Sequence, residues 1–233
     1  MAFALVASVA AGSAAGGAIT TAGVDTTGAN LLVVFYSEYV GSGATESISD
    51  SKSNAYTYLT AYSSAAQERV RIAYKLSPTV STGSADHTFT SNNGTSYSSI
   101  CAMAFSGVDI FDPGKDVGTV DGGASPATAG SVTPSENDCL VIFGAGYRAT
   151  HSGTSINGGF TIPAGLNIDY VGSTRFGAVM AYLIQTSAAA SNPAYAFTGS
   201  NGWSAAQAVF QAAAGAGGTV VPVLMNQYRQ RWS

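Results

Sequence analysis

The chain repeats itself at a fixed spacing, and this repeat most limits the folds open to it. An apolar run, GANLLVVFYSEY, occupies residues 28–39, and a run of the same shape, ENDCLVIFGAGY, occupies residues 136–147. The 108-residue spacing between Val24 and Val132 aligns both runs without a gap. It also aligns Tyr62 with Tyr170, Ala73-Tyr74 with Ala181-Tyr182 and Phe89-Thr90 with Phe197-Thr198. The sequence therefore predicts an internal duplication.

The distribution of residue types along the chain indicates its fold class. Short runs rich in Val, Ile, Thr, Tyr and Phe are separated by Gly, Asn, Ser and Asp, which is typical of an all-β protein. We expect strands at 3–9, 18–24, 31–39, 57–63, 69–76, 86–91, 98–106, 117–121, 128–133, 139–147, 160–163, 167–171, 176–185, 194–198 and 204–212. Each repeat then holds enough strands for one jelly-roll-like β-sandwich. Residues 64–68 are a candidate helical turn, and the Ala-rich residues 204–214 also suit a helix, although their repeat partner indicates a strand.

The repeats define the predicted domains. We expect repeat 1 over residues 1–109, repeat 2 over 110–214, and a C-terminal arm over 215–233. Two arrangements stay open: two tandem sandwiches, or one larger pseudo-symmetric sandwich. The junction VDIFDPGKDVG, residues 108–118, contains Pro, Gly and charged residues and resembles a linker, which slightly favours tandem sandwiches.

The C-terminal arm has a composition suited to docking. GAGG at 215–218 predicts a flexible hinge. The segment beyond it is first apolar and then carries Tyr228, Arg229, Arg231 and Trp232. Tyr, Trp and Arg dominate interface hot spots, so these four residues are the predicted partner-binding anchors. The arm would lie either on its own sandwich or on a neighbouring protein.

Composition narrows the range of partners. The chain is 46% apolar and only 9% charged, against about 25% charged in average proteins. Such an uncharged, hydrogen-bonding surface suits packing against copies of itself, a larger assembly or sugars. The nine Lys and Arg residues are scattered and the net charge is −4, so we expect no nucleic-acid partner. No apolar stretch approaches the roughly 18 residues of a membrane helix, and the first residues alternate as in a strand, without the basic start of a signal peptide.

No residue pattern marks a catalytic centre, and we expect a protein that is not an enzyme. Cys101 and Cys139 align with apolar strand positions, which predicts free, buried thiols. His87 and His151 are isolated and lack a nucleophile motif nearby, so we expect surface or turn histidines. A glycosidase pair among Glu38, Glu46, Asp50 and Glu68 is the weakest of the functional readings.

We also expect no cofactor and no metal. Asp109, Asp112 and Asp116 cluster in the junction and could hold Ca²⁺, but their spacing is not that of an EF-hand, and a solvated turn explains them better. Asn93-Gly94-Thr95 matches a glycosylation acceptor and is read as a turn.

Several segments together carry a family resemblance. They are DTTGANLLVVF, SISDSKSNAYTYLT, VRIAYKLSPTVSTGS, HTFTS, AMAFSGV, SVTPSENDCLVIF, SINGGFTI and MAYLIQTSAAASNPAYAF. Over roughly residues 17–213 the chain resembles uncharacterised structural proteins of tailed bacteriophages. The resemblance implies a virion protein, either a head decoration (cement) protein or a tail component. Its partners would be the major capsid protein or tail proteins and further copies of itself, with a trimer as one form.

A second functional class stays open at this level. A tail or fibre module would bind a carbohydrate receptor by stacking exposed aromatic rings on sugars. The candidate rings are Tyr39, Tyr58, Tyr62, Tyr195 and Trp203.

Overall fold

The computed structural model is built from strands, with no helix among the residues it describes. These are residues 3–13, 17–39, 47–64, 68–92, 97–121, 123–148, 150–171, 175–198 and 202–212. No membrane-crossing helix therefore occurs within these ranges. The first half contains β1 (Ala4–Ser13), β2 (Ile19–Thr20), β3 (Leu31–Tyr39), β4 (Ile48–Asp50), β5 (Thr57–Ser63), β6 (Glu68–Leu76), β7 (Phe89–Ser91) and β8 (Ser98–Ser106). The second half contains β9 (Val108–Asp121), β10 (Ala127–Thr128), β11 (Cys139–Tyr147), β12 (Thr150–Ile156), β13 (Asn167–Val171), β14 (Arg175–Gln185), β15 (Ala194–Thr198) and β16 (Trp203–Ala212).

The strands form four antiparallel sheets, two in each half of the chain. The first half has a five-stranded sheet, β1-β8-β3-β6-β5, and a three-stranded sheet, β2-β7-β4. The second half has a five-stranded sheet, β13-β14-β11-β16-β9, and a three-stranded sheet, β10-β15-β12. Strand orders in the two halves correspond one to one when β1 is matched with β9 and β8 with β16. The predicted all-β class is confirmed.

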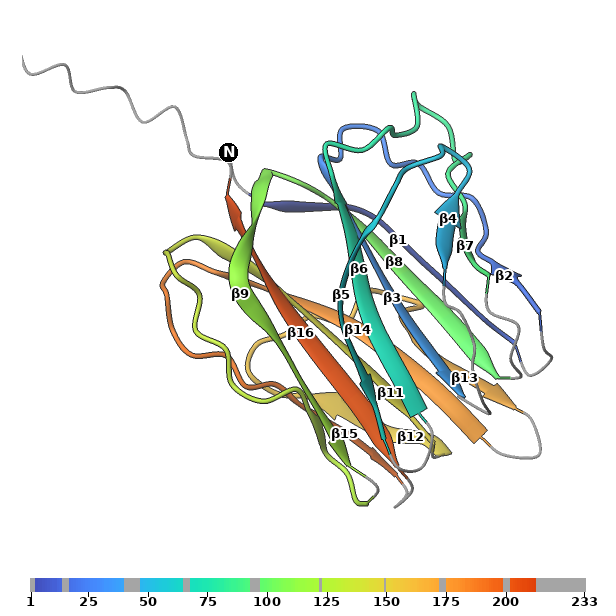
Figure 1. Ribbon diagram of the computed structural model, residues 1–233, viewed down its shortest axis with the longest axis vertical. Helices are drawn as coiled ribbons and strands as arrows, with labels where there is room; N and C mark the ends of the chain where they lie inside the picture. Colours follow the sequence, from blue (N-terminus) through green and yellow to red (C-terminus); the bar gives the residue numbers. More distant parts are fainter. Residues whose placement is uncertain are drawn as a thin grey trace, which may run out of the picture.

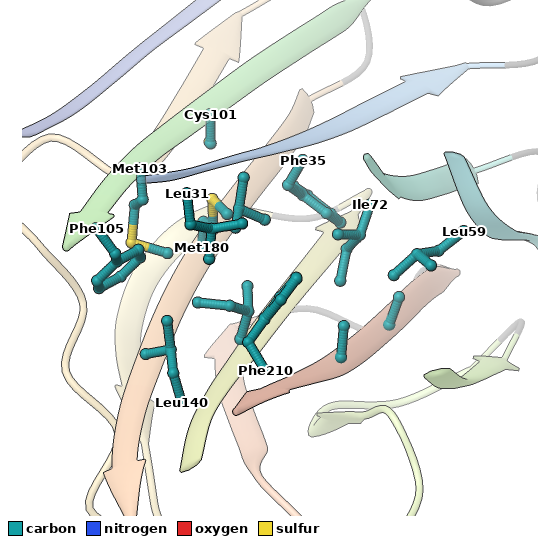
Figure 2. Packing of buried hydrophobic residues seen from close by; sticks show 14 of the residues in the cluster. Leu31, Phe35, Leu59, Ile72, Cys101, Met103, Phe105, Leu140, Met180 and Phe210 are labelled. Carbon is teal, nitrogen blue, oxygen red and sulfur yellow. The ribbon is translucent and has the colours of Figure 1, made fainter. Parts of the chain in front are cut away.

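Three apolar cores separate these sheets into layers (Figure 1). Each three-stranded sheet packs on the five-stranded sheet of its own half, and the two five-stranded sheets pack on each other. We call the contact between the five-stranded sheets the central core and the other two contacts the outer cores. Figure 2 shows Leu31, Phe35 and Met103 of the first half in the central core with Leu140 and Phe210 of the second. The halves are therefore joined by a shared core.

The two five-stranded sheets face each other in a two-fold pattern. β1 lies opposite β13, β8 opposite β14, β3 opposite β11, β6 opposite β16 and β5 opposite β9. Since β13 takes the place in the second sheet that β5 takes in the first, each contact has a mirrored counterpart, as in an isologous dimer interface. Aromatic pairs cross this interface, with ring centroids 5.3 Å apart for Tyr74–Phe210 and for Phe105–Tyr182.

The layering explains why apolar residues follow one another without polar alternation in the middle of the two quoted runs. In β3, Val33 and Phe35 point into the central core, whereas Leu32 and Val34 point into an outer core. Both faces of the strand are buried, so alternation with polar residues is lost. The same holds for β11, whose nine residues are all buried.

The gapless 108-residue alignment does not hold in space at these strands. It pairs Val33 with Val141, but Val33 lies in the central core and Val141 in an outer core. An offset of one residue reverses the face of every side chain in a strand. Because both faces are apolar, the sequence fits either register and conceals the offset. The alignment holds at Val24 and Val132, which both form an isolated bridge before the long strand. It fails again at Cys101 and Val209, which lie in the central core and in an outer core.

The junction predicted as a linker is a strand, which corrects that expectation. β9 is the edge strand of the second five-stranded sheet and pairs with β16. The pairing is interrupted where Phe111 faces Phe210 and Asp116 already faces Ala208. Pro113 and Gly114, whose φ is 72°, lie in this bulge. Proline is tolerated at an edge strand or bulge because its missing N–H is not needed there, so the breakers bend the strand without ending it.

Other local expectations are also resolved. Residues 65–67, the centre of the candidate helical turn at 64–68, lie outside the described residues; at its ends the Ser64 N–H donates to the Glu68 carbonyl at 2.8 Å. The Ala-rich segment is strand β16, as its repeat partner indicated. The strand expected at 160–163 is a single bridge at Thr161, and β4 and β12 were not predicted.

Two glycines of β11 let the five-stranded sheets approach closely. A Cβ built on Gly144 would fall on the ring of Phe35, and one on Gly146 would fall on Ser37 and Val70. The GAG of the second run therefore supplies the space into which side chains of the first half pack.

Candidate functional site

The predicted anchor residues Tyr228, Arg229, Arg231 and Trp232 lie outside the described residues, and their role stays a prediction. The same applies to Glu46, to Asn93-Gly94-Thr95, and to the side chains of Tyr39 and His151. The clearest polar site in the described part of the chain surrounds His87.

His87 is fully buried, so the expectation of a surface histidine is wrong. It lies just before β7, where backbone hydrogen bonds in both directions tie it to Val24. Its ring stacks on Phe89 with centroids 4.6 Å apart. The repeat partner, Tyr195, is also fully buried, and both positions supply a polar ring to an otherwise apolar interior.

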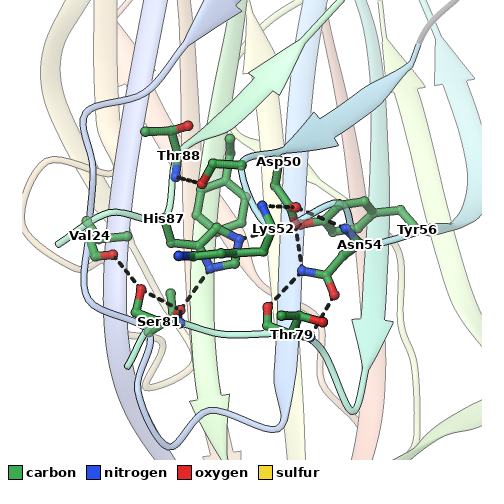
Figure 3. A network of polar contacts seen from close by, with 12 residues as sticks. Val24, Asp50, Lys52, Asn54, Tyr56, Thr79, Ser81, His87 and Thr88 are labelled. Atoms are coloured by element: carbon green, nitrogen blue, oxygen red, sulfur yellow. Dashed lines mark hydrogen bonds and ion pairs between the residues drawn. The ribbon is translucent and has the colours of Figure 1, made fainter. Parts of the chain in front are cut away.

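Both ring nitrogens of His87 have polar neighbours (Figure 3). Nε2 lies 3.2 Å from Asp50 Oδ2, and Nδ1 lies 2.8 Å from Thr26 Oγ1. Thr26 Oγ1 in turn accepts a hydrogen bond from the Ser81 N–H at 3.0 Å and donates to Ser81 Oγ at 3.4 Å. An acid, an imidazole and two hydroxyls thus form one chain, which we call the Asp50–His87 clasp.

Asp50 is held by several donors besides His87. Oδ1 accepts from the backbone N–H groups of Lys52 and Asn54 at 2.9 and 3.0 Å. Oδ2 accepts from Asn54 Nδ2 at 2.9 Å and from the Tyr56 hydroxyl at 2.7 Å. Burial alone would raise the pKa of Asp50, but the contacts with His87, Tyr56 and Asn54 outweigh it and hold the pKa well below the ordinary value. The carboxylate is therefore charged and serves as the centre of the clasp.

The surface side of the clasp is a shell of weaker contacts. Lys52 Nζ lies 2.6 Å from Asp86 Oδ2, with side chains 20% and 48% exposed. Asn54 also bonds the backbone of Thr79 in both directions, with its Nδ2 donating to the carbonyl and its Oδ1 accepting from the N–H. The clasp thus connects the segment before β3, the turn after β4 and the β6–β7 loop.

The clasp has the residue types of a catalytic triad without the exposure that catalysis requires. In a triad the hydroxyl attacks a bound substrate, so it must reach solvent or a pocket. Here the Asp50 and His87 side chains are 0% exposed, Thr26 is 0% and Ser81 is 1%. Its contacts instead fix three loops around an outer core. We assign it a structural role.

The candidate glycosidase carboxylates do not meet. Cross-strand register places Glu38 opposite Arg69 and Tyr39 opposite Glu68, so Glu38 and Glu68 project from opposite faces of the sheet. Burial raises the pKa of Glu38 to about 7, with Arg69 partly offsetting the effect. Burial likewise raises the pKa of Glu68, whose Oε2 accepts a hydrogen bond from Ser64. Asp50 is occupied in the clasp.

The three junction aspartates are spread along β9. Asp109 is exposed, Asp112 is buried and accepts from the Ser135 N–H at 2.8 Å, and Asp116 accepts from the Thr60 N–H at 2.8 Å. Within the described ranges, no three His, Cys, Asp or Glu side chains are grouped as metal ligands. The solvated turn expected for these residues is wrong, because they belong to a strand.

Both cysteines are free and buried, as predicted. Burial raises the pKa of the Cys101 thiol. Cys101 packs in the central core and Cys139 in an outer core. Thiols in such surroundings act as small apolar side chains.

The proposed sugar-stacking rings do not form a platform. Tyr195 and Trp203 are 0% and 3% exposed, so their expected exposure is wrong. Tyr58 is half-buried, its hydroxyl accepts from the Ile48 N–H and its ring lies 4.9 Å from the Arg71 guanidinium carbon. Tyr62 is half-buried against Gly118. The exposed large apolar residues are instead Ile110, Val120 and Ile184.

Comparisons with models of known protein families, with curated proteins and with solved structures find no match. The functional argument therefore rests on the residues and their arrangement. Sequence patterns missed the clasp because its members are distant in the chain, with Thr26, Asp50, Ser81 and His87 on separate segments. The Val24–His87 bridge and the pairing of β4 with β7, which sets Asp50 opposite Phe89, bring them together.

Proposed function

We propose that the protein is a non-enzymatic structural component of a tailed-bacteriophage virion, as a head decoration (cement) protein that binds the capsid shell. The observation that carries this proposal is that the chemistry-bearing groups form core contacts. The Asp50–His87 clasp, both cysteines, Glu38 and Glu68 are all buried. What faces the solvent is a low-charge β-surface, which suits protein association.

We infer further that the two halves arose by duplication of one jelly-roll-like module. The equal strand orders support this, together with the aligned positions in the sequence. In each half the first strand pairs with the eighth and the third with the sixth, as in a jelly roll, while the second, seventh and fourth form the other sheet. The fifth strand departs from that pattern by joining the larger sheet beside the sixth.

A cement protein holds capsomers by buried area and shape complementarity. A β-body with little charge can supply a broad contact without removing ions from water. The C-terminal arm, residues 215–233, would add a local anchor through Tyr228, Arg229, Arg231 and Trp232. Its partners would be the major capsid protein and further copies of this chain, a trimer about a capsid symmetry axis being one arrangement.

The test is rebinding to phage heads that lack the protein. We expect the full chain to sediment with such heads and a chain lacking residues 215–233 to stay in solution with an unchanged circular dichroism spectrum. Trp232→Ala should weaken binding about 30-fold, the effect of one hot-spot residue. Trp203→Phe is the matched control, because Trp203 is buried and the loss of its Nε1 hydrogen bond to the Ala124 carbonyl changes the interior and not the surface. Full binding by the truncated chain would refute the anchor, and no binding by the full chain would refute the head assignment.

The second candidate is a tail or fibre receptor-binding module. Two of the aromatic rings predicted to bind sugars, Tyr195 and Trp203, are buried in the interior. A glycan array with the full chain tests it directly. Specific glycan binding, together with tail labelling in electron micrographs, would replace the head assignment by this one.

A further inference from the structure

The edges of the two five-stranded sheets differ in how they are protected. Exposed edge strands attract other strands, and proteins block this with charges, proline, bulges or short strands. On one side of the molecule, β9 carries charged residues, Pro113 and a bulge. Beside it, the Thr60 N–H of β5 is already bonded to the Asp116 carboxylate. On the other side β13 is short, with five residues.

The remaining edge, β1, has almost none of these protections. It is ten residues long, ALVASVAAGS, and contains no charge and no proline. Asp25 is the first charged residue in the chain. Among the described residues β1 pairs with β8 alone, and its one irregularity lies between Leu5 and Ala7. Residues 7–12 therefore present a continuous row of backbone groups on the side away from β8.

The central core and one outer core are each incompletely covered along β1. Leu5 and Ala10 pack at the margin of the central core, and Val9 and Ala11 pack at the margin of an outer core. All four are only half-buried. One more strand beside β1 would pair the outward-facing backbone groups of residues 7–12 and cover both margins at once.

We propose that this strand is a self-association site, at which β1 of one copy pairs antiparallel with β1 of a second copy across a two-fold axis. A charged partner strand would lose hydration here and gain no ion pair. A strand pairing with its own copy sets like residues against like, which is unfavourable for charged strands and harmless for this one. The two five-stranded sheets of the two copies would then continue into one another.

The proposal concerns how copies join and does not depend on the virion role. It predicts a dimer as the basic unit, whereas a cyclic trimer needs two different surfaces on each copy.

Sedimentation equilibrium of the full chain, across a hundredfold range of concentration, is the first measurement. We expect a reversible monomer–dimer equilibrium. Ser8→Lys should weaken dimerisation at least tenfold, because Ser8 is a half-buried β1 residue and each introduced charge would lose hydration in the paired strands without gaining an ion pair. Ser8→Thr is the conservative control and should dimerise as the unmodified chain does. Val120→Lys, on the protected β9 edge, should also leave the dimer intact.

Hydrogen exchange of the unmodified chain gives a second readout, which does not depend on how a substitution affects folding. Amide protons in residues 7–12 should become more protected as concentration rises, while those of β9 stay constant. A chain that is monomeric throughout would overturn the proposal. So would a dimer broken by Val120→Lys, or by removal of residues 215–233, with β1 exchange independent of concentration.

Discussion

Asp50 accepts two backbone and two side-chain hydrogen bonds in addition to its contact with His87. We predict that Asp50→Ala lowers the free energy of unfolding by about 3–5 kcal/mol, because it leaves buried donors without an acceptor. Lys52→Ala is the control. It removes the surface ion pair with Asp86 and should cost far less than Asp50→Ala, because solvent screens the pair. Urea unfolding measures both, and equal effects would contradict the structural role of the clasp.

The buried carboxyl group of Glu38 makes the stability of the fold depend on pH. Its pKa in the folded chain is about 7, above its ordinary value, because burial disfavours the charged form. A group whose pKa is higher in the folded than in the unfolded chain contributes stability at pH values below its unfolded pKa. This contribution is lost as the pH rises through the folded pKa of about 7. We predict that Glu38→Gln gains roughly 2 kcal/mol relative to the unmodified chain between about pH 5 and about pH 8. Asp109→Asn, at an exposed position, should show no such gain.

Urea unfolding midpoints of both chains, measured as a function of pH, test the prediction for Glu38. Parallel curves for the Gln variant and the unmodified chain would mean that Glu38 is hydrated and charged in the fold.

Single residues also mark where sequence reasoning reaches its limit. Cys101 and Cys139 were predictable because each aligns with an apolar strand position. His87 was not, because its partners Asp50 and Thr26 come from other segments, and only the folded backbone shows that they converge.

At the scale of the strand, Gly144 and Phe35 form a contact between the halves. We predict that Gly144→Ala destabilises the chain by about 1–3 kcal/mol, because the new methyl group would overlap the Phe35 ring. Phe35→Ala alone should cost about 3–5 kcal/mol. In the double variant the methyl group has room, so its cost should fall well below the sum of the single effects. Additive costs in urea unfolding would show that the two strands do not touch.

Strands differ in how well sequence defines them. The limits of β3, β8 and β11 were predicted to the residue, because each contains an apolar run and follows a segment rich in Gly, Asn, Ser or Asp. The first part of β9 was predicted as a linker because proline and glycine, here Pro113 and Gly114, normally interrupt a strand. At an edge the sheet tolerates them, and edge position is a property of the assembled fold.

At the scale of the molecule, the central core makes the halves depend on each other. We predict that residues 1–107 alone do not form a stable monomer, since Val33, Phe35 and Met103 would face water. The full chain should unfold in one transition in calorimetry, with equal calorimetric and van't Hoff enthalpies. A soluble, monomeric half with a cooperative melt would mean that the central core is dispensable.

The predicted repeat left two arrangements open, two tandem sandwiches or one larger sandwich, and gave no contact between the halves. Placing one sheet on the other requires knowing which face of each strand is inward. In β3 and β11 both faces are apolar, so the pattern carries no such information.

The central claim is that the molecule acts by association within a virion. A density map of the particles encoded with this chain tests it most directly. The account predicts density for the four-layer β-body on the outer surface of the head, with its C-terminal arm against the shell. Particles whose heads lack this density, or that carry it only at the tail tip, would contradict the head assignment.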